Sequence, residues 1–171
     1  MRPHLFLLIP ACLFGALPAA ADELPKRKAG LWELKMAFGG RESPLQNIQQ
    51  CTDAETDALM TTNFGGGMGD KCDKPKISKS GDTFTVESRC RIGGTTMATR
   101  AVITGDFNSA YTVAVTPLEG GGQGSDRAMT MQAKWVGPCR QGQRAGDIIM
   151  PGGIRINVRE LAIGTGAPPR R

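Results

Sequence analysis

The feature that most constrains this fold is an alternation of apolar and polar residues with a period of two, repeated along much of the chain. In the clearest run, Trp32, Leu34 and Met36 fall on one side of an extended backbone, with Glu33 and Lys35 on the other. Such patterning is typical of β-strands that bury one face and wet the other. Similar runs lie at 84–92, 97–103, 111–115, 129–135 and 154–158, with weaker ones at 46–50 and 76–78.

Short turns separate these runs, and most of the turns contain glycine. Such turns join antiparallel neighbours, because a parallel crossover needs a dozen or more residues. The sequence therefore predicts a mostly β fold: a single antiparallel sheet of about seven or eight strands, either curved or closed into a partial barrel. One short helix is expected at about 53–60, because Thr52 to Glu55 has the pattern of a capping box.

The N-terminal segment has the three-part pattern of a secretory signal peptide over residues 1–21. A short basic start precedes an apolar run, and Ala19 and Ala21 then give the small-x-small pattern of a cleavage site. We predict cleavage between Ala21 and Asp22, and export to the periplasm or the medium. The apolar run at 5–16 is too short to span a bilayer, so no transmembrane segment is expected in the mature chain.

Cleavage would remove His4, the only histidine in the chain. A chain without histidine has no Ser-His-Asp triad, no Cys-His pair and no His-ligated zinc. Carboxylates then remain as the main acid–base groups, and those singled out are Glu33, Glu87, Asp106 and Asp147. Because aspartate and glutamate are rarely buried, each of the four is interpreted as solvated surface. The sequence pattern places no two of them together, so we assign no catalytic, cofactor-binding or metal-ligating residue and expect no cofactor.

The rest of the chain is expected to form a single β-rich domain over residues 22–163, followed by a disordered tail over residues 164–171. The formal net charge of +5 is modest. Its two basic clusters, at 26–28 and 170–171, lie near the ends of the mature chain and are interpreted as solvated surface. Nucleic acid is therefore not an expected partner, and the sequence leaves the oligomeric state open.

Four cysteines would remain after cleavage, and an even number in an exported chain predicts two disulfides. A three-residue loop at 80–82 would set an antiparallel register that places Cys72 opposite Cys90. The preferred pairing is therefore Cys72–Cys90 with Cys51–Cys139. The pairing Cys51–Cys72 with Cys90–Cys139 stays open, because a change of one residue in the loop length breaks the register.

Five segments of the chain stand in a characteristic order: Gly30–Glu33, Gln50–Met60, Ser80–Val86, Thr104–Val113 and Lys134–Cys139. No single one is specific, but their order over about residues 29–139 resembles an exported proteobacterial family of unknown function, domain-of-unknown-function family 3617. The resemblance implies a periplasmic, disulfide-bonded, β-rich protein. It brings no catalytic residues to this chain.

These observations favour a non-enzymatic protein that binds a small apolar ligand, because a curved sheet with one apolar face can hold such a ligand in its concavity. The alternative is an envelope interaction module whose sheet edge or glycine loops contact another protein. A carboxylate-based hydrolase is the third hypothesis, since acid–base chemistry does not require histidine.

Overall fold

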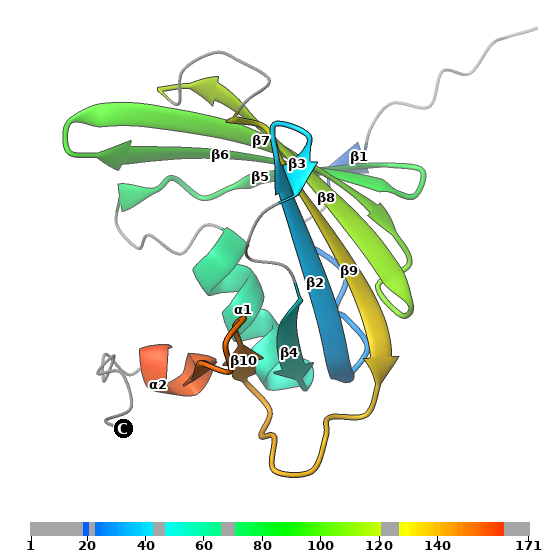
Figure 1. The fold of residues 1–171 in the computed structure, drawn as a ribbon. Helices are drawn as coiled ribbons and strands as arrows, with labels where there is room; N and C mark the ends of the chain where they lie inside the picture. The colour runs from blue at the N-terminus through cyan, green and yellow to red at the C-terminus, as the bar shows by residue number, and fades with distance from the viewer. Residues whose placement is uncertain (1–18, 21–22, 43–46, 66–70, 121–126, 163–171) are drawn as a thin grey trace, which may run out of the picture.

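The protein is represented by a computed structural model that describes residues 19–20, 23–42, 47–65, 71–120 and 127–162. The cleavage site at Ala21 and Asp22, most of the signal-peptide region and the tail at 164–171 lie outside these residues. One antiparallel sheet and two helices form the fold (Figure 1). The elements are β1 (Ala19–Ala20), β2 (Gly30–Phe38), β3 (Arg41–Glu42), β4 (Ile48–Thr52), α1 (Ala54–Gly65), β5 (Lys76–Ser80), β6 (Thr83–Ile92), β7 (Thr95–Gly105), β8 (Ala110–Glu119), β9 (Met129–Gly137), β10 (Asp147–Ile149), β11 (Arg155–Asn157) and α2 (Val158–Ala162).

The predicted fold class is confirmed: the chain is mostly β, with one antiparallel sheet that has two free ends and does not close into a barrel. The strands outnumber those expected because β1, β3 and β10 each have only two or three residues, too few to show a period. The run predicted at 154–158 is wrong at its end, since β11 stops at Asn157 and α2 begins at Val158.

The strand order along the sheet is β1-β5-β6-β7-β8-β9-β2-β4-β10-β11, and β3 pairs with β2. From β5 to β9 each strand pairs with its neighbour in sequence, as short turns dictate. The N-terminal strand β2 then inserts between β9 and β4, which sets Trp32 opposite Trp135 and Leu34 opposite Ala133. At this junction β2 and β9 approach closely, because a Cβ on Gly30 would lie 2.6 Å from Nε1 of Trp135.

The β5–β6 hairpin has a two-residue turn, with Ser80 opposite Thr83. The three-residue loop expected from the sequence is therefore wrong by one residue. Cys72 nevertheless lies opposite Cys90, because the segment between Cys72 and β5 contains one more residue than the matching part of β6. Such an extra residue restores the register in the manner of a β-bulge.

Helix α1 runs from Ala54 to Gly65, longer than the helix expected from the sequence. Its N-cap is Asp53, not Thr52: Oδ1 of Asp53 accepts the Thr56 N–H at 2.8 Å, and the Thr56 hydroxyl oxygen accepts the Asp53 N–H at 3.0 Å. This is a reciprocal cap shifted by one residue from the predicted box. The shift arises because Thr52 still belongs to β4, where its hydroxyl donates to the carbonyl of Gly30.

The core lies between one face of the sheet, here called the inner face, and the two helices (Figure 1). Apolar side chains from β2, β4, β6, β7, β8, β9 and β10 meet Met60 of α1 and Val158 of α2. Phe107, from the turn between β7 and β8, stacks on Tyr111 with ring centroids 5.2 Å apart. The largest buried side chain is Trp32, which is fully enclosed and donates its indole N–H to the carbonyl of Lys28.

Candidate functional site

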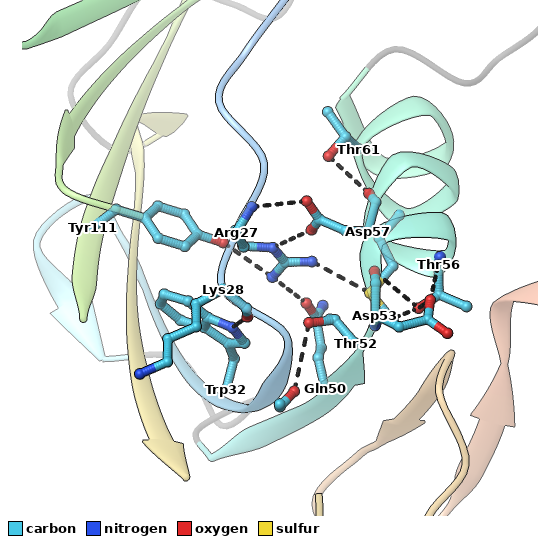
Figure 2. A network of polar contacts seen from close by, with 12 residues as sticks. Arg27, Lys28, Trp32, Gln50, Thr52, Asp53, Thr56, Asp57, Thr61 and Tyr111 are labelled. Carbon is cyan, nitrogen blue, oxygen red and sulfur yellow. Dashed lines mark hydrogen bonds and ion pairs between the residues drawn. The ribbon is translucent and has the colours of Figure 1, made fainter. Parts of the chain in front are cut away.

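An arginine near the start of the described chain penetrates the core and joins three elements (Figure 2). The backbone N–H and Nε of Arg27 donate to the two carboxylate oxygens of Asp57 on α1, at 2.9 and 2.6 Å. Nη1 donates to Oε1 of Gln50 on β4 at 2.7 Å and to the Tyr111 hydroxyl on β8 at 3.2 Å. Nη2 lies 3.3 Å from the sulfur of Met60. We call these five residues the arginine clamp.

The Arg27–Asp57 ion pair is almost completely shielded from solvent, since the two side chains are only 8% and 3% exposed. A buried charge is tolerated when it is paired and hydrogen-bonded, and both conditions hold here. Burial raises the pKa of Tyr111 above its ordinary value of 10.0, while the positive charge of Arg27 acts in the opposite direction. Tyr111 is therefore a neutral hydrogen-bonding partner near pH 7 and not a general base.

The sequence interpretation of the basic cluster at 26–28 as solvated surface is wrong for Arg27. Lys26 and Lys28 are exposed, whereas Arg27 points inward. No periodic pattern marks this residue, because it lies outside any strand or helix. One signal was available: Asp57 precedes Met60 by one helical turn, so a carboxylate lies on the side of α1 that had to be buried. A buried carboxylate requires a cationic partner.

The four carboxylates singled out from the sequence have separate partners on different elements. Glu33 accepts from Nε2 of Gln49 at 3.2 Å, and Glu87 pairs with Arg100 at 2.9 Å. Asp106 organises the β7–β8 turn, and hydrogen bonds from the backbone and hydroxyl of Ser109 lower its pKa to about 2. The structure assigns these three to local surface contacts.

Asp147 differs from the other three carboxylates because it is completely buried, although the sequence favoured solvated surface. It accepts from Nδ2 of Asn157 and from the backbone N–H of Arg144, both at 2.8 Å, and lies 3.6 Å from the Arg155 guanidinium. These contacts bind the β10–β11 hairpin to the preceding turn. Asp147 is therefore explained by the fold alone.

Two disulfides join segments that are distant in sequence. One links Cys51 on β4 to Cys139 after β9, and the other links Cys72 to Cys90 on β6. This is the first of the two pairings considered from the sequence. Two disulfides in a small protein are typical of an oxidising, extracytoplasmic environment. Among the described residues, no cluster of histidine, cysteine and carboxylate side chains suited to a metal ion occurs, and no helix is long and apolar enough to cross a membrane.

The inner face of the sheet continues past the part covered by the helices. Along three adjacent strands full burial ends at the same level: Tyr111, Ala133 and Leu34 are buried, and the next residues on this face are only partly buried. On β2 the series ends at Phe38, which is exposed. The register sets these residues in two rows across β8, β9 and β2. We call the six of them the inner apolar patch: Val113, Met131 and Met36 in the first row, and Val115, Met129 and Phe38 in the second.

The six side chains of the inner apolar patch are all aliphatic, aromatic or thioether groups, and Phe38 at its end is 43% exposed. Three of its six members are methionines, whose unbranched thioethers adapt to ligands of different shape. It joins the buried core without a break, because Met36, Val113 and Met131 pack against core residues. The arrangement can therefore take up an apolar group, but it offers no chemistry for bond making or breaking.

A comparison with protein-family models finds one match, described as a protein of unknown function (DUF3617), over residues 27–139. The chain belongs to this family. The matched segment begins at Arg27 and ends at Cys139, so it contains the arginine clamp, both disulfides and the inner apolar patch. The β10–β11 hairpin and α2 lie beyond it. No match to a curated protein or to a solved structure was found.

Proposed function

We propose that this member of the DUF3617 family is an exported protein, cleaved after Ala21, that binds a single acyl chain on the inner apolar patch without chemical turnover. The observation that carries the proposal is the incomplete burial of six apolar residues on β8, β9 and β2, on the same face as the core, ending at exposed Phe38. The two disulfides support the proposed export to an oxidising compartment such as the periplasm.

The chemistry of the patch favours a methylene chain over a polar or aromatic ligand. No hydroxyl, amide or charged side chain lies within the six residues to orient a polar group, and the methionines can follow a flexible chain. Each methylene removed from water contributes roughly 0.8 kcal/mol, so burial of about eight would give roughly 6 kcal/mol before the costs of association. A free energy of about 6 kcal/mol corresponds to a Kd of about 40 µM, so once the association costs are subtracted we expect a Kd near or above the millimolar range.

The first test is native mass spectrometry of protein purified from the periplasm without detergent. A chain that begins at Asp22, carries two disulfides and holds an added mass that is lost on denaturation would support the proposal. Titration with a fluorescent fatty acid then measures binding directly. Saturable binding is expected, and a chain that binds no more probe than an unrelated β protein would refute ligand binding.

Two substitutions locate the binding surface. Phe38→Ser removes the most exposed side chain of the patch, and Ile154→Ser is its matched control, because Ile154 is also an exposed apolar residue but lies in the β10–β11 turn, outside the patch. We expect Phe38→Ser to weaken binding of the fluorescent fatty acid about tenfold, as burial of a phenylalanine is worth roughly 1.5–3 kcal/mol when complete and this side chain is already partly covered. Equal effects of both substitutions would contradict the assignment of the patch.

A further inference from the structure

The outer edge of β5 is only partly paired in the described part of the chain. Each residue of this strand, from Lys76 to Ser80, pairs with β6 on one side. On the other side, within the described part of the chain, only the two residues of β1 pair with it: Ala19 lies opposite Lys79 and Ala20 opposite Ser78 (Figure 1). The edge therefore already accepts an extended antiparallel segment.

The segment that occupies this edge is part of the leader that we propose is cleaved after Ala21. Cleavage would remove β1 and leave the backbone N–H and C=O groups on the outer side of β5 without a strand partner. Exposed strand edges of this kind are templates for a further strand. This inference therefore rests on the cleavage step of the proposed function, although not on the binding of an acyl chain.

The charges around the edge select the chemistry of the incoming strand. Lys74, Lys76 and Lys79 are all exposed, and none takes part in a salt bridge within the described residues. Nζ of Lys79 lies 5.2 Å from the centre of the Phe84 ring, which keeps its charge close to the sheet. An added strand would run between these ammonium groups and would be favoured if it carried carboxylates.

A second copy of this chain fits the edge poorly. Two β5 strands related by a two-fold axis at Ser78 would set Ile77 of each chain opposite Lys79 of the other, with Lys76 at both ends of the short ladder. Two lysines from each chain would then share one small interface, and like charges in neighbouring strand positions are destabilising. Edge lysines are a common device against self-association for this reason. The charge pattern thus disfavours a homodimer and favours an acidic partner.

We propose that β5 of the mature chain binds an extended, acidic segment of another protein as an added antiparallel strand, in the place that β1 occupies before cleavage. The backbone of β5 supplies the hydrogen bonds, and Lys76 and Lys79 supply the preference for glutamate or aspartate. The interaction surface is separate from the inner apolar patch, because β5 and the three strands of the patch lie apart in the strand order.

The test uses the periplasmic protein and a labelled synthetic peptide of glutamate and valine that carries glutamates on both faces of the extended strand, because Lys76 and Lys79 lie on opposite faces of β5. Fluorescence anisotropy measures binding, and amide hydrogen exchange reports whether β5 becomes protected. We expect saturable binding, slower exchange in β5, and no binding of a peptide in which lysine replaces each glutamate. Equal binding of the acidic and basic peptides, binding without protection of β5, or a dimer formed through β5 would each overturn the proposal.

A matched pair of charge reversals distinguishes binding at the edge of β5 from nonspecific attraction between the acidic peptide and the positive charge of the protein. Lys76→Glu changes an exposed lysine on the edge strand, whereas Lys35→Glu changes an exposed lysine on β2, which has neighbours on both sides. Lys76→Glu should weaken peptide binding about threefold to tenfold, and Lys35→Glu should leave it nearly unchanged. Equal losses would refute the role of β5.

The mass of the purified chain and the two binding assays together distinguish the two proposals. A chain that keeps its leader contradicts both the cleavage step and the edge inference. A chain that begins at Asp22 and binds fatty acid but not the acidic peptide overturns the edge inference alone. A chain that binds the peptide but no fatty acid overturns only the assignment of the inner apolar patch.

Discussion

Replacement of Arg27 by methionine gives the sharpest test of the energetics of this fold. The substitution keeps an unbranched side chain of similar length but removes the positive charge and every donor of the guanidinium. Asp57 is then left as a carboxylate that is 3% exposed and has no cationic partner, and Gln50 and Tyr111 each lose a hydrogen-bond donor. Removal of one member of a buried ion pair typically costs about 3–5 kcal/mol, and we expect a loss of that size.

Urea unfolding with the disulfides intact measures this loss. With a urea dependence of about 2 kcal/mol/M, the transition midpoint should fall by roughly 1.5–2.5 M. Lys26→Met is the matched control, because Lys26 is the exposed neighbour and makes none of the contacts of the clamp. Its effect should stay within about 0.5 kcal/mol.

The double variant Arg27→Met/Asp57→Leu tests the cause of the loss. If the cost arises from an uncompensated buried carboxylate, replacement of both charges should recover at least about 2 kcal/mol relative to the sum of the single variants. A loss below about 1 kcal/mol for Arg27→Met would refute the reasoning. So would single-variant losses that simply add, because the two residues would then act independently.

Two further predictions concern the disulfides and the buried tyrosine. Removal of the Cys51–Cys139 disulfide, which spans 88 residues, should cost about 1.4 kcal/mol more than removal of Cys72–Cys90, which spans 18, because the longer loop loses more chain entropy; urea midpoints of the double alanine variants in the reverse order would contradict this. Tyr111 is the only tyrosine, so tyrosinate absorbance during an alkaline titration reports it alone. Its native pKa should exceed 10.0, and stability should therefore fall above pH 10 because the unfolded chain ionises first; a midpoint at or below 10.0 would contradict the burial argument.

Local sequence patterns predict much of this fold because neighbouring strands are also neighbours in sequence. The runs that became β6, β7, β8 and β9 have clear alternation and short turns, and their pairing follows from chain connectivity. The position of β2 between β9 and β4 has no such signal. It depends on the packing of distant segments, as in the close approach of Gly30 to Trp135. Period-two patterns report which face is buried, not which strand lies alongside.

The candidate surfaces were predictable to different extents. Alternation places Met129 and Met131 on the apolar side of one strand, but only the register shows that Met36 and Phe38 extend the same rows. The inward position of Arg27 was not predicted, because a single buried residue in a loop produces no periodic pattern in the sequence. The prediction that Cys72 lies opposite Cys90 was correct, although the predicted β5–β6 loop was one residue too long. The error was cancelled by the extra residue between Cys72 and β5.

The arginine clamp and the inner apolar patch occupy successive parts of the same sheet face, and this arrangement separates stability from binding. The clamp holds α1 at the part of the face that contains Tyr111, which is buried, whereas Val113 and Val115 farther along β8 are only partly buried. A buried ion pair contributes little net stability. A shift of the helix to another position would, however, separate the two charges and leave each of them buried without its partner, which costs free energy. The ion pair therefore keeps α1 from sliding along the strands onto the patch. On this argument Arg27→Met lowers stability by removing the clamp, whereas Phe38→Ser weakens binding at little cost to the fold.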